Sequence, residues 1–455
     1  MRVLVIGLDS EPPALWDAFA EDMPTITGLR GRGVFAPLRS TDPPITVPAW
    51  MSMMSGRDPG ELGVYGFRNR SAYDYGSLVT ANGDAVRHPR VWDVLSAIGR
   101  TTAVIGVPGT YPVRPVNGVM VSDFLTPPGA TFTYPERFAR TVEAIVGGSY
   151  AFDVNDFRTA DLARIRNDAF LMTSRRFDLV ERLLGQQPWD FLMVHEIGLD
   201  RIHHAFWNHF DDSHPRFVPD SPFAGVVRNY HRFLDGQIAR VVAAAPPDTA
   251  VFIVSDHGSR PMAGGVFVND WLRREGLLTL KAEPAPGSRF EMSMVDWART
   301  RVWAEGGYYG RIFFNVAGRE PEGIVPPDEV DALAARVTAG LEALDCGAEV
   351  VRPSATYRRV EPIAPDLMVY LGGLGWRALA SVGHDGLYTY ENDTGPDGAN
   401  HDRLGVFLAW APGGVRRLGP DGEASILDVA ATLLHPFGVA DQVPGNPIVE
   451  VVRDA

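Results

Sequence analysis

Short, continuous apolar runs recur along the chain, and they constrain its fold more than any other feature. The first of them, "RVLVIGLD", is rich in branched residues and suits a strand buried on both faces, as in a parallel sheet. Helical patterns such as residues 171–187, 328–344 and 426–438 lie between or after such runs. This alternation predicts a doubly wound α/β sheet. The predicted strands are residues 2–9, 101–108, 189–197, 249–258, 365–371 and 404–413.

The amino-acid composition of the chain changes between residues 262 and 360, where aromatic and turn-forming residues are concentrated. We predict that residues 262–360 form an inserted cap subdomain, and that residues 1–261 and 361–455 form one catalytic core. The aromatic side chains of the insertion could line a substrate pocket, but packing inside its own core is the favoured interpretation because aromatics dominate cores. These aromatic residues are Trp271, Trp297, Trp303, Tyr308 and Tyr309.

Charge and cysteine content exclude several classes of protein. The net charge of -14 supplies no basic excess for binding a nucleic-acid polymer, although a metal ion can reverse the local field for a small anion. The one cysteine, Cys346, rules out an intramolecular disulfide and a thiolate metal cluster. No apolar run reaches 18 residues, so we expect a cytoplasmic protein without a membrane partner.

Aspartate and histidine residues stand at the ends of the predicted strands. In open α/β sheets ligands collect at the carboxyl ends of strands, which makes these positions candidates for a site. Carboxylate and imidazole ligands together fit Zn²⁺, with Mn²⁺ as the alternative. Each position also has a structural interpretation as a cap, a turn or a solvated helix face, and spacing alone leaves both open. The candidates are Asp9, Asp200, His204, Asp256, His257 and His401, of which Asp200 and His204 share one helix face by their spacing.

A single threonine, Thr46, stands between Pro44 and Pro48 in "PPITVPAWMSMMSG", at the head of a predicted helix. On this stretch alone a helix N-cap is the favoured interpretation. The alternative is chemical, because a helix N-terminus binds anions and a hydroxyl there can attack phosphorus. Two metal ions about 4 Å apart would clamp the attacking and leaving oxygens of such a displacement. Metal coordination would then let Thr46 act as a nucleophile without a histidine base.

Five motifs in order resemble the alkaline phosphatase superfamily, and most of all its type I phosphodiesterase/nucleotide pyrophosphatase branch. Within that branch the chain is similar to the predicted phosphohydrolase/phosphomutase group, and the likeness spans nearly its whole length. The resemblance implies an alkaline-phosphatase-like three-layer sandwich with a mostly parallel central sheet and an inserted cap. The motifs are "LVIGLDS", "PPITVPAWMSMMSGRDPGELGVYGF", "GLDRIHHAFW", "VSDHG" and "GANHDRLGVFLAWAPG".

The resemblance also implies roles for the candidate residues. Asp200, His204 and His401 match the ligands of one metal ion. Asp9, Asp256 and His257 match those of the other, on which Thr46 is also a ligand and the nucleophile. The implied mechanism has two in-line steps through a phosphothreonine, with two divalent ions, Zn²⁺ favoured over Mn²⁺, as cofactors.

Two positions depart from the family pattern after the threonine helix. An asparagine that contacts the phosphoryl group in nucleotide pyrophosphatases falls near Phe67 in this chain, and Arg68, Asn69 or Arg70 are the candidate replacements. A plain turn with solvated arginines explains the same residues equally well. The family "HG" is replaced by Leu62–Gly63. Both changes put the binding of the substrate's second ester group in doubt.

We therefore expect a two-metal phosphoester hydrolase acting on a small phosphorylated metabolite, with phosphodiester or pyrophosphate bonds favoured. The alternatives are a phosphomonoesterase or phosphomutase of the same superfamily, or a binder of phosphorylated ligands that has lost turnover.

Overall fold

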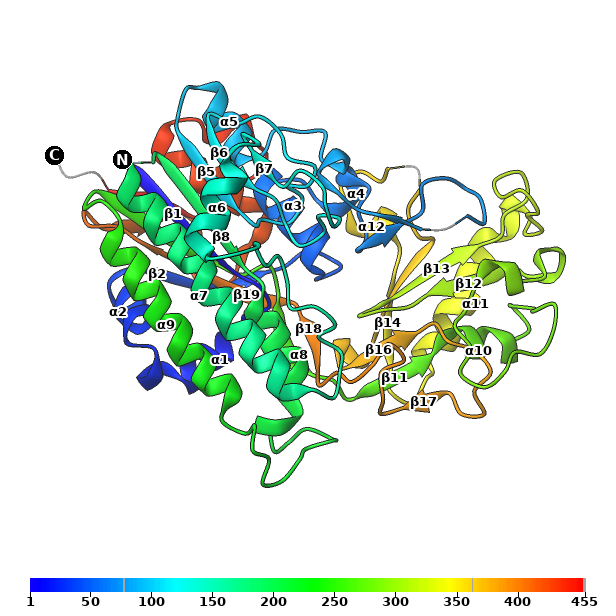
Figure 1. Ribbon diagram of the computed structural model, residues 1–455. Helices are drawn as coiled ribbons and strands as arrows, with labels where there is room; N and C mark the ends of the chain where they lie inside the picture. The colour runs from blue at the N-terminus through cyan, green and yellow to red at the C-terminus, as the bar shows by residue number, and fades with distance from the viewer. Residues whose placement is uncertain (77, 188, 362, 453–455) are drawn as a thin grey trace.

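A nine-stranded sheet is the centre of the molecule (Figure 1). The computed structural model describes residues 1–76, 78–187, 189–361 and 363–452. Strands β1, β5, β6, β8 and β9 run parallel, and β19 pairs antiparallel with β9 and β2. The strand order is β21 (Ala424–Ser425), β2 (Val34–Arg39), β19 (Leu404–Trp410), β9 (Thr249–Val254), β1 (Arg2–Leu8), β8 (Phe191–Glu196), β5 (Thr102–Ile105), β6 (Gly118–Val121) and β7 (Thr133–Tyr134).

The central strands are buried on both faces, as their continuous apolar runs predict. Along β1, Leu4 and Ile6 point into one apolar core, and Val3 and Val5 point into the other. Because side chains alternate across a strand, one short run supplies both cores. The fold class predicted from the sequence is confirmed, and five of the six predicted strands correspond to β1, β5, β8, β9 and β19.

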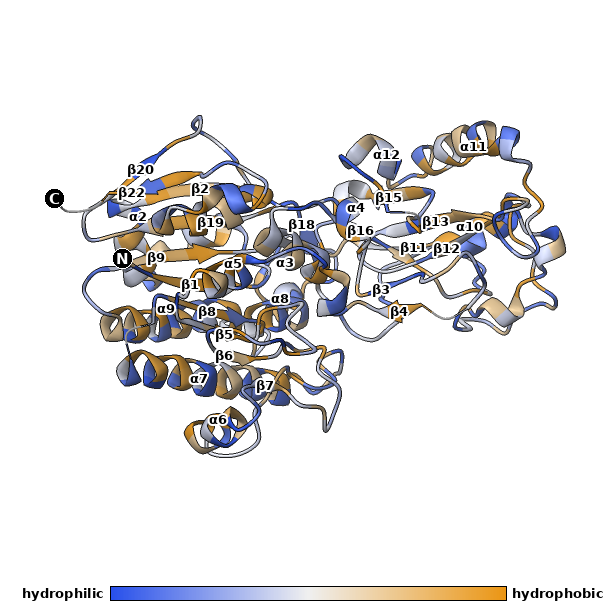
Figure 2. Ribbon diagram, turned by 90° about the horizontal axis from the view of Figure 1, so that it is seen from above, coloured by the Kyte–Doolittle hydropathy of each residue, from blue (hydrophilic) through white to orange (hydrophobic). Residues whose placement is uncertain are grey.

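Helices cover both faces and make the sandwich three layers thick. In Figure 2 the ribbon of α7 alternates between hydrophobic and hydrophilic colours, as expected for a helix with one face on the sheet. The first face packs against α1 (Pro13–Ala18), α2 (Pro24–Arg32), α6 (Phe138–Val146), α7 (Leu162–Gln186), α8 (Gly198–Phe210) and α9 (Val226–Ala244). The second face packs against α3 (Thr46–Ser55), α5 (Val91–Ala97) and α13 (Val429–Leu434). The short α4 (Pro59–Leu62) follows α3.

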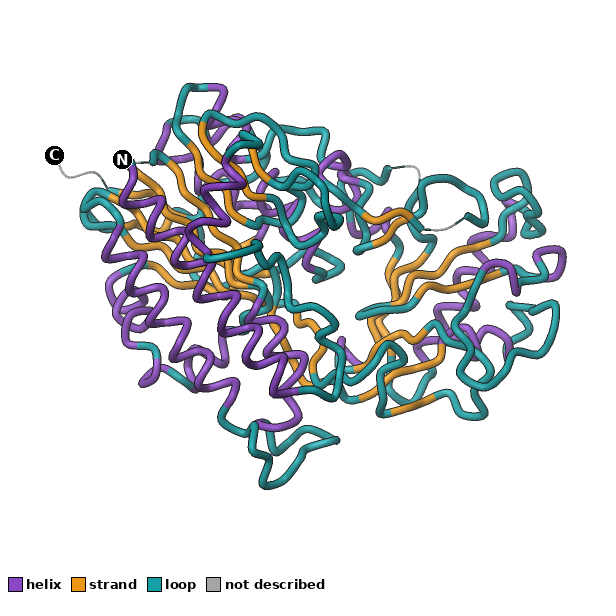
Figure 3. The backbone as a smooth tube through the Cα atoms, viewed as in Figure 1, coloured by secondary structure: helices purple, strands orange, loops and turns teal. Residues whose placement is uncertain are grey.

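A second sheet forms a separate layer beside the core and is richer in strand and loop than in helix (Figure 3). Its strand order is β12 (Val302–Glu305), β13 (Gly310–Phe314), β15 (Leu367–Leu371), β16 (Trp376–Leu379), β11 (Gly264–Phe267) and β17 (Tyr388–Thr389), with β14 (Ala348–Val351) on β15. Its helices are α10 (Val268–Arg274), α11 (Val330–Glu342) and α12 (Pro353–Thr356).

The second sheet extends past residue 360, where the sequence interpretation ended the insertion. The run at residues 365–371, predicted as a core strand, is β15 of this second sheet. A strand buried on both faces carries the same continuous apolar pattern in either sheet, so the pattern does not report which sheet it joins.

Three short ladders complete the described strands: β3 (Arg68–Asn69) with β4 (Val79–Thr80), β10 (Gly258–Pro261) with β18 (Ala399–Asp402), and β20 (Val415–Arg417) with β22 (Val449–Val451). Among the helices of the described residues, none has both the length and the apolar character needed to cross a bilayer.

Candidate active site

Strand register brings distant candidates to one edge of the central sheet. Parallel pairing of β1 with β9 sets Gly7 opposite Val254, so Asp9 and Asp256 both stand two residues beyond the same rung. On the other side of β1, Leu8 lies opposite Glu196, shortly before the helix that carries Asp200 and His204. The antiparallel pair β10 (Gly258–Pro261) and β18 (Ala399–Asp402) then places His401 beside the residues that follow His257.

Four of the predicted residues form what we call the threonine cluster: Asp9, Thr46, Asp256 and His257. The Thr46 hydroxyl lies 3.5 Å from Asp9 Oδ1 and 3.2 Å from His257 Nε2. Asp256 Oδ2 lies 3.1 Å from the same His257 nitrogen. All four side chains are buried.

Thr46 is the first residue of α3, and the N-cap position belongs to Ile45. The hydroxyl makes no capping hydrogen bond, so the cap interpretation of this residue is wrong. Its oxygen instead faces the carboxylate and imidazole of the threonine cluster from the N-terminal end of the helix, where free N–H groups favour an anion.

The other three predicted residues form the helix cluster: Asp200, His204 and His401. Asp200 Oδ1 lies 3.2 Å from His204 Nε2 and 3.7 Å from His401 Nε2. The rings of His257 and His401 stack with centroids 3.7 Å apart, and this contact joins the two clusters into one site.

The side chains of both clusters have the donor set and the unmet bonding capacity that divalent cations need. His257 and His401 donate their Nδ1 hydrogens to the carbonyls of Gly258 and Pro44, at 3.0 and 2.9 Å, so both Nε2 atoms present lone pairs. In zinc proteins this arrangement fixes the ligand tautomer. Within the two clusters, three buried atoms have no hydrogen-bond partner among the described residues: Asp200 Oδ1, Asp256 Oδ2 and His401 Nε2. Ligand atoms lie within 4.8 Å of one another in two sets, Asp9–Asp256–His257 and Asp200–His257–His401.

The two clusters differ in electrostatics. Burial, with repulsion from Asp200, raises the pKa of Asp9 to about 7, and burial beside Asp9 raises the pKa of Asp256. Burial opposes the charged form of Asp200 as well, but His204 and Arg201 outweigh it and hold the pKa of Asp200 low. Burial opposes protonation of His204, yet Asp200 and Asp397 raise its pKa to about 10. In the metal-free protein His204 therefore holds a proton next to the Asp200 carboxylate. A cation bound between Asp200 and His204 would displace this proton.

Several supporting residues were missed by sequence reasoning. Trp50 Nε1 and His195 Nε2 donate to Asp9 Oδ2 at 2.9 and 2.8 Å. Asp397 accepts from His204 Nδ1 at 2.8 Å and is itself neutralised by arginines. His195 is the penultimate residue of the buried strand β8, so the strand-end rule that found Asp9 could have found it, whereas Asp397 carries no local signal.

Asp402 follows His401 in the chain but does not orient its ring. Its carboxylate accepts from the Arg403 backbone, and the Pro44 carbonyl orients His401 instead.

One aromatic residue of the second sheet reaches the site. Tyr308 stacks on His401 with centroids 3.7 Å apart, and its hydroxyl lies 3.3 Å from His204 Nε2. The other aromatic residues singled out in this segment are buried, as predicted, and Trp271, Trp297 and Trp303 pack in the apolar core of the second sheet.

The predicted substrate contacts lie on the segment after α4. The side chain of Asn69 accepts from Tyr65 N at 2.7 Å and donates to Gly66 O at 3.0 Å, so it closes its own turn. Arg68 is exposed, and its backbone carbonyl accepts from Arg311 of the second sheet. Phe67 is half-buried and packs on Phe124, which lies 6.5 Å from the His195 ring. A series of contacts through Phe124 and His195 thus connects Phe67 to Asp9 of the threonine cluster.

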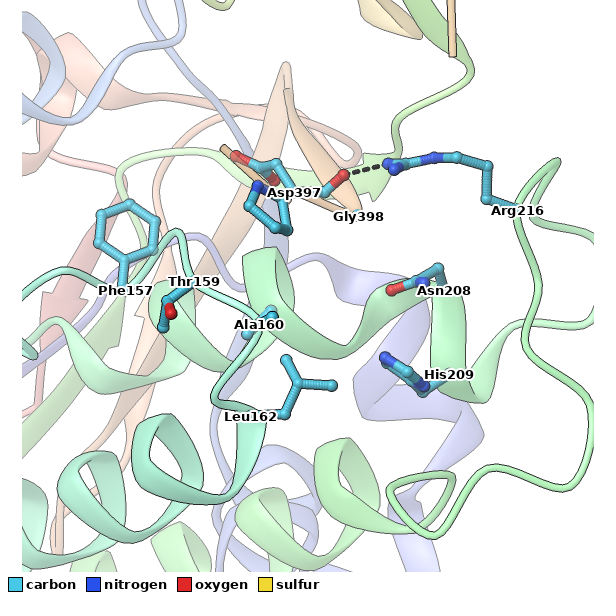
Figure 4. Close-up of a pocket in the computed structure, with 11 residues that line it drawn as sticks. Phe157, Thr159, Ala160, Leu162, Asn208, His209, Arg216, Asp397 and Gly398 are labelled. Atoms are coloured by element: carbon cyan, nitrogen blue, oxygen red, sulfur yellow. Dashed lines mark hydrogen bonds between the residues drawn. The ribbon is translucent and has the colours of Figure 1, made fainter. Parts of the chain in front are cut away.

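A cavity of about 190 Å³ lies beside the C-terminal half of α8 (Figure 4). Its walls include Phe157, Asn208 and Asp397, and Arg216 donates to the Asp397 carbonyl at its rim. The cavity therefore shares Asp397 with the helix cluster.

Comparison with known proteins identifies the family. The family described as type I phosphodiesterase / nucleotide pyrophosphatase matches residues 3–397. No curated protein matches the chain in sequence. Human ectonucleotide pyrophosphatase / phosphodiesterase 5 is structurally similar, with a TM-score of 0.59 at 13% identity over 98% of this chain and 97% of the other.

Two other solved structures share the fold. Phosphonoacetate hydrolase from Sinorhizobium meliloti, in complex with phosphonoformate, aligns with a TM-score of 0.60 at 15% identity over 97% of this chain and 96% of the other. An inactive variant of the murine phosphodiesterase 5, in complex with AMP, aligns with a TM-score of 0.56 at 13% identity over 98% of this chain and 97% of the other. The chain belongs to the type I phosphodiesterase/nucleotide pyrophosphatase family.

Proposed function

We propose that the protein hydrolyses phosphodiester or pyrophosphate bonds of a small phosphorylated metabolite, with Thr46 as the nucleophile and two divalent ions as cofactors. The observation that carries the proposal is the position of the Thr46 hydroxyl at the N-terminus of α3, between Asp9 Oδ1 and His257 Nε2. A capping residue has no need of that position.

Zn²⁺ is the favoured ion and Mn²⁺ the alternative, because the ligands are carboxylates and imidazoles. Asp9, Thr46, Asp256 and His257 would hold one ion, and Asp200, His204 and His401 the other. When bound, the ions neutralise charge on the phosphoryl oxygens and lower the pKa of the coordinated hydroxyl.

The residues of the chain account for the remaining steps. In the metal-free site His257 Nε2 accepts the hydrogen bond of the Thr46 hydroxyl, since its other nitrogen donates to Gly258; with an ion bound, that lone pair would go to the ion instead. Thr46 Oγ1 forms a bond to phosphorus as the bond to the leaving oxygen breaks, and the leaving group departs with the proton that Thr46 loses. Water then attacks the phosphothreonine, the bond from phosphorus to Oγ1 breaks, and the Thr46 hydroxyl is restored. The N–H groups at the start of α3 favour the negative charge on the phosphoryl group throughout.

We also propose that the second sheet acts as a cap on the core. Its Tyr308 lies against His204 and His401, and its Tyr309 and Arg311 hydrogen-bond to the carbonyls of Tyr65 and Arg68. These contacts support a position of the cap at the entrance to the site, where it would limit access of water and substrate.

Paired initial rates on bis(p-nitrophenyl) phosphate and p-nitrophenyl phosphate test the proposal, with Zn²⁺ and Mn²⁺ titrated into chelator-treated protein. We expect metal-dependent turnover with a higher kcat/KM on the diester. A higher kcat/KM on the monoester would replace the diester assignment with a phosphomonoesterase or phosphomutase. If loaded protein cleaves neither compound nor a panel of nucleotides and nucleotide sugars, a binder without turnover is the correct reading.

A further inference from the structure

A second group of metal-ligand side chains lies behind the active site and has no part in the proposed mechanism. It consists of Glu11, His203 and His231, which we call the rear cluster. We propose that the rear cluster is a third divalent-cation site of the zinc class. Its residues come from the loop after β1, from α8 and from α9, three segments that only tertiary folding brings together.

The geometry of the rear cluster is that of a closed site. His231 Nε2 lies 3.1 and 3.3 Å from the two carboxylate oxygens of Glu11. One ligand atom from each of the three residues lies within 4.8 Å of the others. The exposed fractions of Glu11, His203 and His231 are 0%, 0% and 1%, so bulk water does not solvate the carboxylate.

The hydrogen bonds of the two histidines place a hydrogen on the Nδ1 atom of each ring. His231 donates its Nδ1 hydrogen to the Val227 carbonyl at 2.8 Å. His203 Nδ1 lies 3.1 Å from the Ser10 carbonyl, which only accepts, so the hydrogen of His203 is on Nδ1. His203 Nε2 is thereby left as an acceptor, and His231 Nε2 becomes one when no proton lies between it and Glu11.

The state of His203 Nε2 distinguishes a metal site from a buried ion pair. This atom is buried and has no hydrogen-bond partner among the described residues. A proton shared by His231 and Glu11 would satisfy those two residues and leave His203 Nε2 without a partner. A cation would satisfy all three ligands, and two imidazoles with one carboxylate are a ligand set that Zn²⁺ takes in proteins.

The rear cluster is separate from the two clusters of the active site. His203 precedes His204 on α8, and side chains one residue apart on a helix point about 100° apart, so the two imidazoles face different directions. Glu11 and Asp9 likewise diverge from the loop after β1. The loop connects them through Ser10, whose N–H donates to Asp256 Oδ1 at 3.2 Å and whose carbonyl accepts from His203. An ion in the rear cluster would therefore tie this loop to α8 and α9, and hold the backbone that carries Asp9.

Zinc stoichiometry tests the proposal, measured by equilibrium dialysis against Zn²⁺ and elemental mass spectrometry. We expect wild-type protein to hold one more ion per chain than the Glu11→Gln and His203→Gln variants. The matched control is His209→Gln, on the same helix, where the histidine hydrogen-bonds to Ser221 instead of the rear cluster. This control should hold as many ions as the wild type.

A double variant separates this proposal from the proposed function. Asp256→Asn combined with His401→Gln should remove the active-site ions and leave one ion, which a further Glu11→Gln change removes. If the active site binds no metal, wild-type protein would hold a single ion that depends on Glu11, and the third-site proposal would still stand. Equal zinc content in wild type and Glu11→Gln overturns it.

A crystallographic measurement needs no variant and covers the case in which the substitutions prevent folding. Anomalous differences at the zinc edge from wild-type crystals grown with Zn²⁺ should show a peak between Glu11, His203 and His231. A map with peaks only at the active site, or a water molecule without anomalous signal in the rear cluster, refutes the proposal.

Discussion

The threonine cluster and the helix cluster use similar ligands but balance their charges differently. Asp9 and Asp256 are buried carboxylates whose pKa values are raised, and neutral donors such as Trp50 and His195 support Asp9. Asp200 has a guanidinium partner in Arg201, and the pKa of Asp200 is lowered. Behind His204, Asp397 is in turn paired with Arg158 and Arg377.

This difference indicates which cluster needs a bound metal ion to balance its charge. Two carboxylates without a cationic side chain repel one another and favour protonation, so the threonine cluster reaches its charged form most readily with an ion present. The helix cluster is already held together by arginines, and its geometry should persist without metal. Thr46, the proposed nucleophile, thus lies in the part of the site whose charge state would depend most on a bound cation.

Substitution of the nucleophile should have the largest effect on activity. We expect Thr46→Ala to lower kcat on a nitrophenyl diester by about 10⁴-fold or more, because covalent catalysis is lost while the other groups remain. Both clusters should still bind metal, since each keeps three other ligands. Steady-state kinetics and metal analysis measure the two effects, and Thr46→Ser, which keeps the hydroxyl, should recover part of the rate. Undiminished turnover by Thr46→Ala would assign the nucleophile elsewhere.

The pH dependence of stability in metal-free protein should separate the two clusters. The pKa of Asp9 rises from 3.8 to about 7 in the folded state, chiefly by burial, so the folded protein binds this proton more tightly than the unfolded chain. This contribution is fully present below about pH 4 and is lost as the pH rises through about 7. Its size is on the order of 4 kcal/mol of unfolding free energy.

Urea denaturation in the presence of a chelator, between pH 4 and 7.5, measures this loss. The Asp9→Asn variant should lack it, because amide nitrogen and oxygen do not titrate in this range. The helix cluster should respond in a different window, since the raised pKa of His204 lowers stability between about pH 6.5 and 10. Parallel curves for wild type and Asp9→Asn below pH 7.5 would show that Asp9 is not the group responsible.

Substitution of Asp397, which accepts a hydrogen bond from His204 of the helix cluster, should lower activity less than substitution of Thr46. Replacing Asp397 with Asn should lower metal affinity or kcat/KM by about 10- to 100-fold. The reason is that the His204 ring would lose the charged carboxylate that accepts its Nδ1 hydrogen and orients it. Asp402→Asn is the matched control, since Asp402 lies next to His401 but bonds only to the Arg403 backbone in this region. Zinc titrations followed by activity measure both variants. Equal effects of the two substitutions would mean that Asp397 does not position His204.

The sequence predicted the central sheet, and it named the Asp and His side chains that the fold brings together, because both depend on local pattern. Asp9 and Asp256 stand where apolar runs end, and parallel register brings such ends together. The prediction of Thr46 as an N-cap was wrong. A Thr among prolines at the start of a helix gives the same sequence pattern whether its hydroxyl faces the backbone or a ligand. The strand at residues 365–371 was placed in the wrong sheet because burial on both faces is common to both sheets.

The supporting residues could not be predicted, because their roles arise from contacts between segments far apart in the chain. Asp397 meets His204 across 193 positions, and Glu11 meets His231 across 220. Nothing in the local sequence around either carboxylate records its partner.

Tyr308 offers the smallest and most specific test, because it is the point where the second sheet contacts the helix cluster. Tyr308→Ala removes the stacking on His401 and should change kcat/KM by about 2- to 10-fold, the range that an aromatic contact of roughly 0.5–1.5 kcal/mol allows. Tyr308→Phe keeps the ring and loses only the hydroxyl near His204, so its effect should be smaller than that of alanine. If the cap acts by closing the site, the loss should appear mainly in KM for the diester and little in metal content. A loss confined to metal content would instead make Tyr308 a support of the helix cluster, and the second sheet would then stabilise the site without closing it.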